Sequence, residues 1–249
     1  MQKPPKNIIY GARAVMEAME AGREIDKILL KKGLNEGLRQ DVYELATKAD
    51  IPIQTVPFEK LDRLSRRGNH QGVLAFVAMI TFQELESTFM KIVDSGYPAL
   101  IVALDQVSDV RNFGAIARTA ECMGAQAIVI PQDGSARINA DAVKVSAGAL
   151  NHLPVVRVKH MIDMLYMAQE YDFKVIAVSE KADESIFDVN LTKHTILVFG
   201  SEEKGISKRI LREADGLVKI PMQGKIGSLN VSVAAGMALS EAVRQRLFK

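Results

Sequence analysis

Hydrophobic residues along the chain form two kinds of pattern, which alternate. Short runs that are apolar throughout are typical of strands buried on both faces of a sheet. Segments in which apolar residues recur every three or four positions are typical of amphipathic helices. In the second half of the chain the apolar runs cover residues 99–104, 127–130, 154–158, 175–179, 195–199 and 216–220. Helical patterns separate most of them, which predicts an α/β fold with a mostly parallel sheet and helices on both faces.

The N-terminal third repeats this alternation on a smaller scale. Strand-like runs cover residues 25–30, 53–56 and 73–79, and helical patterns cover residues 7–22, 35–49 and 58–64. The segment 81–97 is acidic and helical, and ends in Ser-Gly-Tyr directly before Pro98, so we interpret it as a linker. The sequence therefore predicts a small α/β domain over residues 1–80, a linker over 81–97 and a larger domain over 98–249.

Composition excludes several classes of protein. With 48% hydrophobic residues in 249, the chain has enough apolar surface for a core. It contains no apolar run of about 18 residues, the length needed to cross a membrane, and no apolar stretch typical of a signal peptide follows the N-terminus. The single cysteine, Cys122, excludes an internal disulfide framework and fits a reducing compartment, so we expect a cytoplasmic protein.

Familiar catalytic motifs are missing from the sequence. No Gly-x-Gly-x-x-Gly follows a strand, no Walker-type Gly-Lys-Ser/Thr is present, and no Gly-x-Ser-x-Gly marks a nucleophile elbow. The four histidines are scattered without the spacing of zinc ligands, so no metal is expected. An ordinary dinucleotide fold, a P-loop enzyme and an α/β-hydrolase are thereby disfavoured.

One polar loop in the N-terminal third permits two interpretations. Residues 63–72, RLSRRGNHQG, hold three arginines, two glycines and the hydrogen-bonding side chains of Asn69, His70 and Gln71. Arginine side chains grip phosphates and amides read base edges, so one interpretation is a loop that contacts RNA. The other is a solvated connection before a strand. The net charge of +2 does not by itself indicate a nucleic-acid partner.

Three polar clusters follow predicted strands in the C-terminal domain. They are Asn112 with Arg118, Gly200 with Glu202, and the run 228–230 before an apolar helix. Ligands of open α/β sheets bind beyond the carboxyl ends of the strands, so a ligand site is expected at these strand ends. Asn112 suits the N-cap of a helix.

The residues around Arg118 also suggest how its helix is used. Arg118 lies off the apolar stripe of its predicted helix, on a common face with Arg111 and Gly114. Gly114 lacks a side chain, so another backbone or a ligand is able to approach the helix closely there.

The segments NFGAIARTA (112–120), GSEEKGIS (200–207) and IPMQGKIGSLNVSVAAG (220–236) resemble the three ordered motifs of the SpoU (TrmH-like) branch of the SPOUT methyltransferases. Residues 7–80 resemble the ribosomal-protein-like substrate-binding domain of the bacterial members that methylate a guanosine of 23S rRNA. The resemblance covers nearly the whole chain. It implies a deep trefoil knot in the C-terminal domain, a homodimer, S-adenosylmethionine as methyl donor and methylation of a ribose 2′-oxygen in RNA.

The resemblance also implies which residues form the site. Gly200, Ile220 and Leu229 match the residues that bind the methyl donor, largely through the main chain, and Met222 is an additional contact. Backbone N–H and C=O groups are sufficient to recognise the edge of adenine.

For catalysis, the resemblance points to Arg118, with Glu202 as the residue that orients it. Asn112, Ser228 and Asn230 fix the loops or contact the target nucleotide, although capping alone explains Asn112 or Asn230 equally well. A free guanidinium is a poor base, because its pKa lies above about 12. Arg118 is therefore expected to hold the target phosphate and polarise the 2′-hydroxyl. The proton acceptor stays open between a phosphate oxygen, water and a perturbed Arg118.

Three functions are consistent with these features. The first is 2′-O-methylation of a guanosine in 23S rRNA, and the second is the same chemistry on tRNA or on another rRNA site. The third is a non-catalytic RNA-binding or ribosome-assembly factor, which would not bind the methyl donor.

Overall fold

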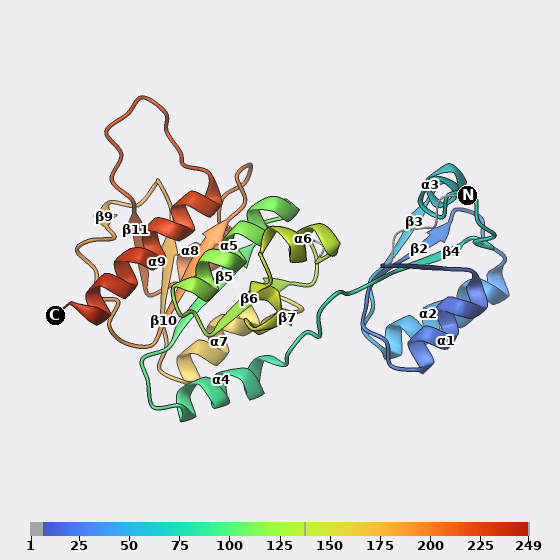
Figure 1. Ribbon diagram of the computed structural model, residues 1–249, viewed down its shortest axis with the longest axis horizontal. Helices are drawn as coiled ribbons and strands as arrows, with labels where there is room; N and C mark the ends of the chain where they lie inside the picture. Colours follow the sequence, from blue (N-terminus) through green and yellow to red (C-terminus); the bar gives the residue numbers. More distant parts are fainter. Residues whose placement is uncertain (1–6, 137, 249) are drawn as a thin grey trace. The chain divides into compact units, whose positions relative to one another are not determined.

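A computed structural model describes residues 7–136 and 138–248 of the chain. The chain folds into two compact units, the first ending at Thr81 and the second beginning at Phe82 (Figure 1). No helix in the described part of the chain is long and apolar enough to cross a membrane.

The first unit is a four-stranded sheet with helices on both faces. Its elements are β1 (Ile8–Tyr10), α1 (Ala12–Glu20), β2 (Ile25–Lys31), α2 (Glu36–Lys48), β3 (Ile53–Val56), α3 (Phe58–Leu64) and β4 (Val73–Val77). The strand order is β1-β4-β2-β3, in which β2 and β3 are parallel and β4 is antiparallel to both of its neighbours. Helices α1 and α2 pack on one face around Val15 and Val42, and α3 packs on the other through Leu61.

The prediction of one helix over residues 7–22 is wrong at its beginning. Residues Ile8–Tyr10 form β1, which pairs with β4, and α1 begins only at Ala12. Gly11, with φ of 98°, provides the sharp change of direction between the two elements. The Gln71 side chain then accepts a hydrogen bond from the backbone N–H of Ala12 at 3.1 Å, which satisfies one free donor of the helix.

The second unit is built on a seven-stranded sheet. Its elements are α4 (Leu85–Asp94), β5 (Leu100–Asp105), α5 (Val110–Cys122), β6 (Ala127–Pro131), α6 (Ala140–Val145), the 3-10 turn η1 (Ala149–Asn151), β7 (Val155–Val158), α7 (Met161–Glu170), β8 (Lys174–Val178), β9 (Glu184–Ser185), β10 (Thr195–Gly200), α8 (Lys208–Glu213), β11 (Gly216–Lys219) and α9 (Val231–Leu247).

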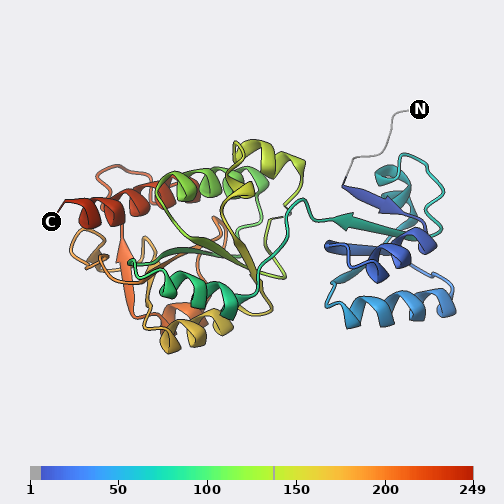
Figure 2. The same cartoon turned by 60° about the horizontal axis from the view of Figure 1, so that its bottom comes forward.

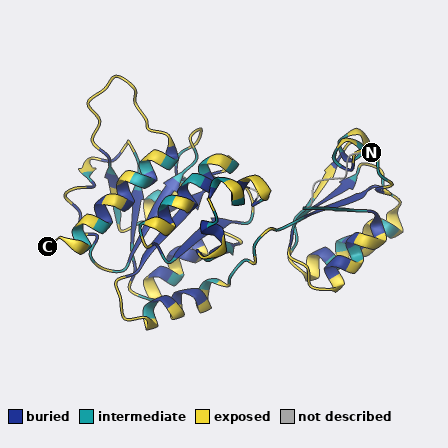
Figure 3. Ribbon diagram, viewed as in Figure 1, coloured by how far each residue is buried: buried dark blue, intermediate teal, exposed yellow. Residues whose placement is uncertain are grey.

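The sheet of this unit confirms the predicted α/β class. Its strand order is β7-β6-β5-β10-β8-β11-β9, and every neighbouring pair is parallel. Helices α5, α6 and α9 cover one face, and α4, α7 and α8 cover the other (Figures 1 and 2). The strands are buried between these layers, whereas the outer helix faces are exposed (Figure 3). This explains why the strand sequences are apolar on both faces.

The predicted linker is incorrect, because most of it belongs to the second unit. Helix α4 lies within residues 81–97 and buries Phe89 completely, with its ring centroid 4.8 Å from that of Phe173. The backbone N–H of Gln83 also donates to the carbonyl of Val155 in β7 at 2.9 Å. The acidic residues that suggested a linker form the solvent-facing side of an amphipathic helix.

Arg246, in the last turn of α9, ties the end of the chain to the body of the second unit. Its guanidinium donates to the carbonyls of Leu191, Pro98, Ala99 and Lys193 at 2.8–3.0 Å. Burial lowers the pKa of this guanidinium. Charge-assisted hydrogen bonds to four carbonyls therefore hold α9 beside the start of β5.

We expect Arg246→Met to lower the free energy of unfolding by about 2–4 kcal/mol, because the four carbonyls lose a charged donor. Urea denaturation of the full chain measures the change. Arg212→Met is the matched control, since Arg212 is an exposed arginine that pairs with its neighbour Glu213 at the surface. The control is expected to change stability by less than about 0.5 kcal/mol. Equal stabilities of the two variants would contradict the anchoring role.

Candidate active site

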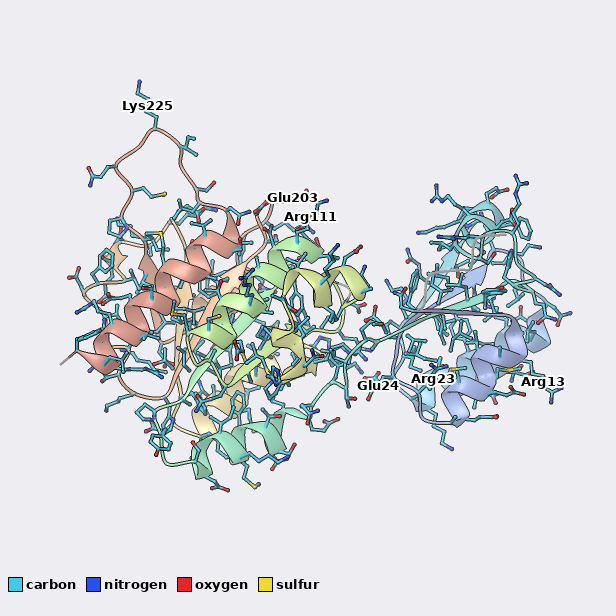
Figure 4. All side chains as sticks on the ribbon, in the orientation of Figure 1. Arg13, Arg23, Glu24, Arg111, Glu203 and Lys225 are labelled. Carbon is cyan, nitrogen blue, oxygen red and sulfur yellow. The ribbon has the colours of Figure 1, made fainter. Side chains whose placement is uncertain are left out.

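A cavity of about 520 Å³ lies beyond the carboxyl ends of β8, β10 and β11, beside the start of α9. This is the edge at which open α/β sheets bind ligands. The cavity is lined by seven of the nine residues predicted from the sequence: Gly200, Glu202, Ile220, Met222, Ser228, Leu229 and Asn230. The loop over residues 221–230 is exposed along its whole length, and Lys225 marks its tip (Figure 4).

The end of β10 is shaped by a tight turn that leaves no room for a side chain at Gly200. A Cβ atom there would lie 2.1 Å from the carbonyl carbon of Gly205 and 2.2 Å from the nitrogen of Ile206. The backbone N–H of Gly205 donates to the carbonyl of Ser201 at 2.8 Å and closes the turn. Because residue 200 is a glycine, the backbone of Gly205 and Ile206 is able to pack directly against it. The turn formed in this way is one wall of the cavity.

Asp105, at the end of β5, holds the far side of this turn and was not predicted from the sequence. Its buried carboxylate accepts a hydrogen bond from the backbone N–H of Ser207 at 2.7 Å. The sequence feature that could have indicated its role is an acidic residue directly after an otherwise apolar strand. Asp105 therefore fixes the segment after β10 against the neighbouring strand.

The three predicted clusters meet in one hydrogen-bond network. The Glu202 carboxylate accepts from the side-chain amides of Asn112 at 3.1 Å and Asn230 at 2.7 Å. The Asn230 amide also donates to the Asn112 side-chain oxygen at 3.0 Å. Arg111 and Glu203, the neighbours of this network along the chain, lie at the same edge of the unit (Figure 4). These hydrogen bonds hold Asn112 beside Glu202 and Asn230, which lie about 90 and 120 residues farther along the chain, next to the cavity.

The two asparagines of the network differ in their use as helix caps. Asn230 is the N-cap of α9, and its side-chain oxygen accepts from the backbone N–H of Ser232 at 2.9 Å. Asn112 is not an N-cap, which corrects the sequence prediction. Asp109 occupies that position in α5 and accepts from the backbone N–H of Asn112 at 2.8 Å. The Asn112 side chain is therefore free of capping and reaches Glu202.

Two predicted residues, Asn112 and Arg118, are not among those that line the cavity, and of these only Asn112 is joined to it, through its hydrogen bond to Glu202. Arg118 lies farther away. It is exposed on α5, six residues beyond Asn112, which corresponds to about 9 Å along a helix. Among the described residues it makes no hydrogen bond or ion pair, and Glu202 bonds to the two asparagines instead. The expectation that Glu202 orients Arg118 is therefore wrong within a single chain.

Gly114, between Asn112 and Arg118, serves helix packing. A Cβ atom at this position would lie 2.8 Å from Cβ of Val145 and 3.0 Å from the carbonyl oxygen of Ala142, both in α6. The close approach expected at Gly114 is therefore confirmed, and the approaching backbone is that of α6.

The end of β8 contributes cavity residues that the sequence reasoning missed. Ser179, Glu180 and Lys181 line the side of the cavity next to β10. The sequence feature that could have revealed these residues is a polar run directly after a buried strand, the same feature that marks the other strand ends of the site. Across the described residues no group of three or more His, Cys, Asp and Glu side chains is arranged to hold a metal ion.

Asn230 allows its two roles to be separated by substitution. Asn230→Asp keeps an oxygen that caps α9 but loses the amide donors and places a second negative charge beside Glu202. We expect this variant to keep most of its stability and to lose activity about 10- to 100-fold. Asn230→Ala should lose activity and also about 1 kcal/mol of unfolding free energy. Thermal unfolding measures stability, and an assay of the methyl transfer that the resemblance implies measures activity. An active Asn230→Asp variant would exclude a role of the network in activity.

Comparison with known proteins connects this site to a family. Residues 99–240 match the model of the SpoU rRNA methylase family, and residues 8–83 match the model for RNA 2′-O ribose methyltransferase substrate binding. A 23S rRNA (guanosine-2′-O-)-methyltransferase, RlmB of Xanthomonas axonopodis pv. citri, is 37% identical over 241 residues, which are 96% of each chain. An uncharacterised tRNA/rRNA methyltransferase of Mycolicibacterium vanbaalenii is 34% identical over 96% of this chain and 76% of its own.

Solved structures agree with these sequence matches. The SpoU methyltransferase AviRb of Streptomyces viridochromogenes, determined in complex with AdoMet, is 26% identical, with a TM-score of 0.63 over 97% of this chain and 91% of its own. The A. aeolicus TrmH/SpoU tRNA modifying enzyme is 32% identical, with a TM-score of 0.55 over 65% of this chain and 84% of its own. The family model covers most of the second unit, including all nine predicted site residues, and the chain belongs to the SpoU rRNA methylase family.

Proposed function

We propose that the protein transfers a methyl group from S-adenosylmethionine to the ribose 2′-oxygen of a guanosine in 23S rRNA. The observation that supports this most strongly is the network of Asn112, Glu202 and Asn230, which joins the three motif segments beside one cavity. The RlmB relatives, about a third identical over nearly the full chain, indicate the substrate. The cytoplasm, where bacterial rRNA is made and assembled, is the proposed location.

The cavity fits a ligand of the size of S-adenosylmethionine. Its volume lies within the range of about 300–1,000 Å³ that is usual for small-molecule sites. We propose that Gly200 and Ile220 bind the donor through their main chains, and that the partly exposed side chains of Met222 and Leu229 cover its apolar parts. Bound there, S-adenosylmethionine supplies an electrophilic methyl group. AviRb, which shares this fold, holds AdoMet in its structure.

The chain's own polar residues then position and activate the RNA. We propose that Arg118 holds the target phosphate and polarises the 2′-hydroxyl, which stabilises the negative charge that develops on its oxygen. The hydroxyl proton passes to a phosphate oxygen or to water. Ser228 and the amides of Asn112 and Asn230 hold the loops around the target nucleotide, and Glu202 holds those amides.

A homodimer is proposed because the site is incomplete in one chain. Arg118 is exposed outside the cavity of its own protomer, so we propose that it reaches the cavity of a second copy. The helix α9 carries an apolar groove with a volume of about 670 Å³, beside exposed Val233, Met237 and Phe248. Continuous exposed apolar surface of this kind marks an interface. Light scattering should give twice the 27.4 kDa mass of one chain.

The polar side chains at the rim of this groove are joined by hydrogen bonds. Arg244 bonds to both carboxylate oxygens of Glu241 at 2.7 and 2.8 Å, which lowers the pKa of that carboxyl. Gln245 bonds to Glu241 and to the carbonyl of Val189 at 2.8 and 2.9 Å. These contacts fix the loop before β10 against α9, so the apolar groove has a defined shape.

A second candidate substrate is tRNA, because some relatives carry the name tRNA/rRNA methyltransferase. Incubation of the protein with tritiated S-adenosylmethionine and either unmodified 23S rRNA or unmodified tRNA distinguishes the two. The proposal predicts label in 23S rRNA alone. Label in tRNA alone would show that the protein methylates tRNA and not 23S rRNA. If neither RNA is labelled and the protein does not bind the donor, a non-catalytic RNA-binding factor is favoured.

A further inference from the structure

The first unit carries a surface strip in which an exposed aromatic ring lies next to a cationic loop. We propose that this strip, made of Phe58, Lys31, Arg66, Arg67 and Asn69, binds unpaired nucleotides of the RNA substrate, with a base stacked on the Phe58 ring. The proposal deepens the proposed function and rests on it, because it assigns a recognition site for the same substrate.

Phe58 is the proposed stacking platform. It begins α3 yet leaves 46% of its surface exposed, while Leu61 of the same helix is fully buried and forms the core face. The ring packs on one side against His70, at 4.9 Å between centroids, and Lys31 Nζ lies 5.6 Å from its centre. An exposed ring that is held in place by a neighbouring ring and accompanied by a cation suits a nucleotide, which combines a flat base with a phosphate.

The loop after α3 is arranged so that its cationic residues point to solvent. His70 is buried, and its Nδ1 accepts from the backbone N–H of Gly72 at 3.0 Å. Gln71 caps α1 through its side-chain oxygen. The contact of Gln71 disfavours base reading by that amide, so of the two amides in the RNA-contacting interpretation only Asn69 is left for it. Arg66, Arg67 and Asn69 remain exposed on the outside of the loop.

The backbone of this loop is held in one unusual conformation. Arg66 and Arg67 have φ angles of 55° and 62°, and Gln71 has 51°, values that side-chain-bearing residues seldom adopt. Gly68 lies so close to Tyr10 that a Cβ atom would approach its ring to 2.6 Å. Such backbone strain persists only where the surroundings enforce it, and it concentrates at functional sites. A loop fixed before binding loses little entropy when it binds a ligand.

The chemistry of the strip favours single-stranded RNA over a duplex. The faces of paired bases are covered by their neighbours, so only an unpaired base is able to stack on Phe58. The guanidinium groups of Arg66 and Arg67 are suited to phosphates. Arg67 Nε lies 4.0 Å from a carboxylate oxygen of Asp62, and 90% of the Arg67 side chain is exposed, so this weak pair leaves the arginine accessible.

Fluorescence anisotropy of the full chain with labelled oligouridylate tests the proposal, with an RNA duplex of equal length as comparison. Phe58→Ala should weaken binding to the single strand about 10-fold and leave binding to the duplex unchanged. Phe58→Trp should bind like the wild type, whereas Phe58→Leu, which keeps apolar bulk without a flat ring, should bind like the alanine variant. Arg66→Ala and Arg67→Ala should each lower the salt dependence of binding, by about 0.7 in the log–log slope.

Controls separate this site from general charge effects and from the catalytic unit. Arg13→Ala and Arg39→Ala remove exposed arginines of the same unit that lie in the helices α1 and α2, and should not change affinity. Calorimetry with S-adenosylmethionine should give the same affinity for every variant. Wild-type affinity of Phe58→Ala for the single strand, or equal losses on single strand and duplex, would overturn the proposal. Intact donor binding in that case would leave the proposed function standing.

Discussion

Replacement of Arg118 by alanine should lower the rate of methyl transfer at least about 100- to 1,000-fold while donor affinity stays at the wild-type value. The rate falls because the developing charge on the ribose oxygen loses its cationic partner. Donor affinity is kept because the proposed role of Arg118 is to hold the RNA, whereas other residues line the cavity proposed for the donor. Arg118→Lys should recover only part of the rate, since an ammonium group lacks the planar fork of a guanidinium. Single-turnover kinetics and calorimetry measure the two quantities.

Arg111→Ala is the matched control, because Arg111 is exposed on the same face of α5. It should keep a rate within a few-fold of the wild type. A normal rate in the Arg118→Ala variant would remove Arg118 from the mechanism.

Mixed dimers show whether Arg118 acts in its own chain or in the partner. One chain carries Arg118→Ala and the other carries a substitution that destroys the donor cavity. If Arg118 acts across the dimer, each mixed dimer has one intact site, and random mixing restores about a quarter of the wild-type rate. If it acts within its own chain, the mixture stays inactive.

Gly200→Ala should abolish donor binding. The new methyl group would overlap the backbone of Gly205 and Ile206, so the turn that forms one wall of the cavity has to move. Backbone atoms are less able to move aside than the end of a flexible side chain. We therefore also expect the free energy of unfolding to fall by about 1–3 kcal/mol. Calorimetry with S-adenosylmethionine and urea denaturation measure the two effects.

Gly224→Ala provides the comparison, because nothing lies within 4 Å of a Cβ atom at that position. Gly224 belongs to the exposed loop 221–230, so this variant should bind the donor normally. Normal donor binding by Gly200→Ala would show that the turn after β10 does not form part of the donor site.

The sequence predicted the architecture because burial on both faces of a parallel sheet leaves a clear pattern. The run Leu100–Leu104 is fully or almost fully buried, and its apolar character is visible without any structure. The site was predictable in outline, since polar residues directly after such strands must meet at one edge of the sheet. The network of Glu202 with the two asparagines fulfils that expectation.

Other features depend on contacts between distant segments, and local patterns do not encode these. The strand β1 has only three residues and forms because β4 pairs with it. Helix α4 resembled a linker because its exposed face is acidic, while Phe89 finds its partner in Phe173 far along the chain. The separation of Arg118 from Glu202 follows from the direction of the α5 axis, which spacing along the sequence does not reveal.

The most direct test of the account is a map of ribose methylation in total RNA from cells with and without the gene, read by mass spectrometry of nuclease fragments. The account predicts that one 2′-O-methylguanosine of 23S rRNA disappears with the gene. It should return with the wild-type gene and fail to return with Arg118→Ala. An unchanged set of 23S rRNA marks, or the loss of a mark in tRNA alone, would contradict it.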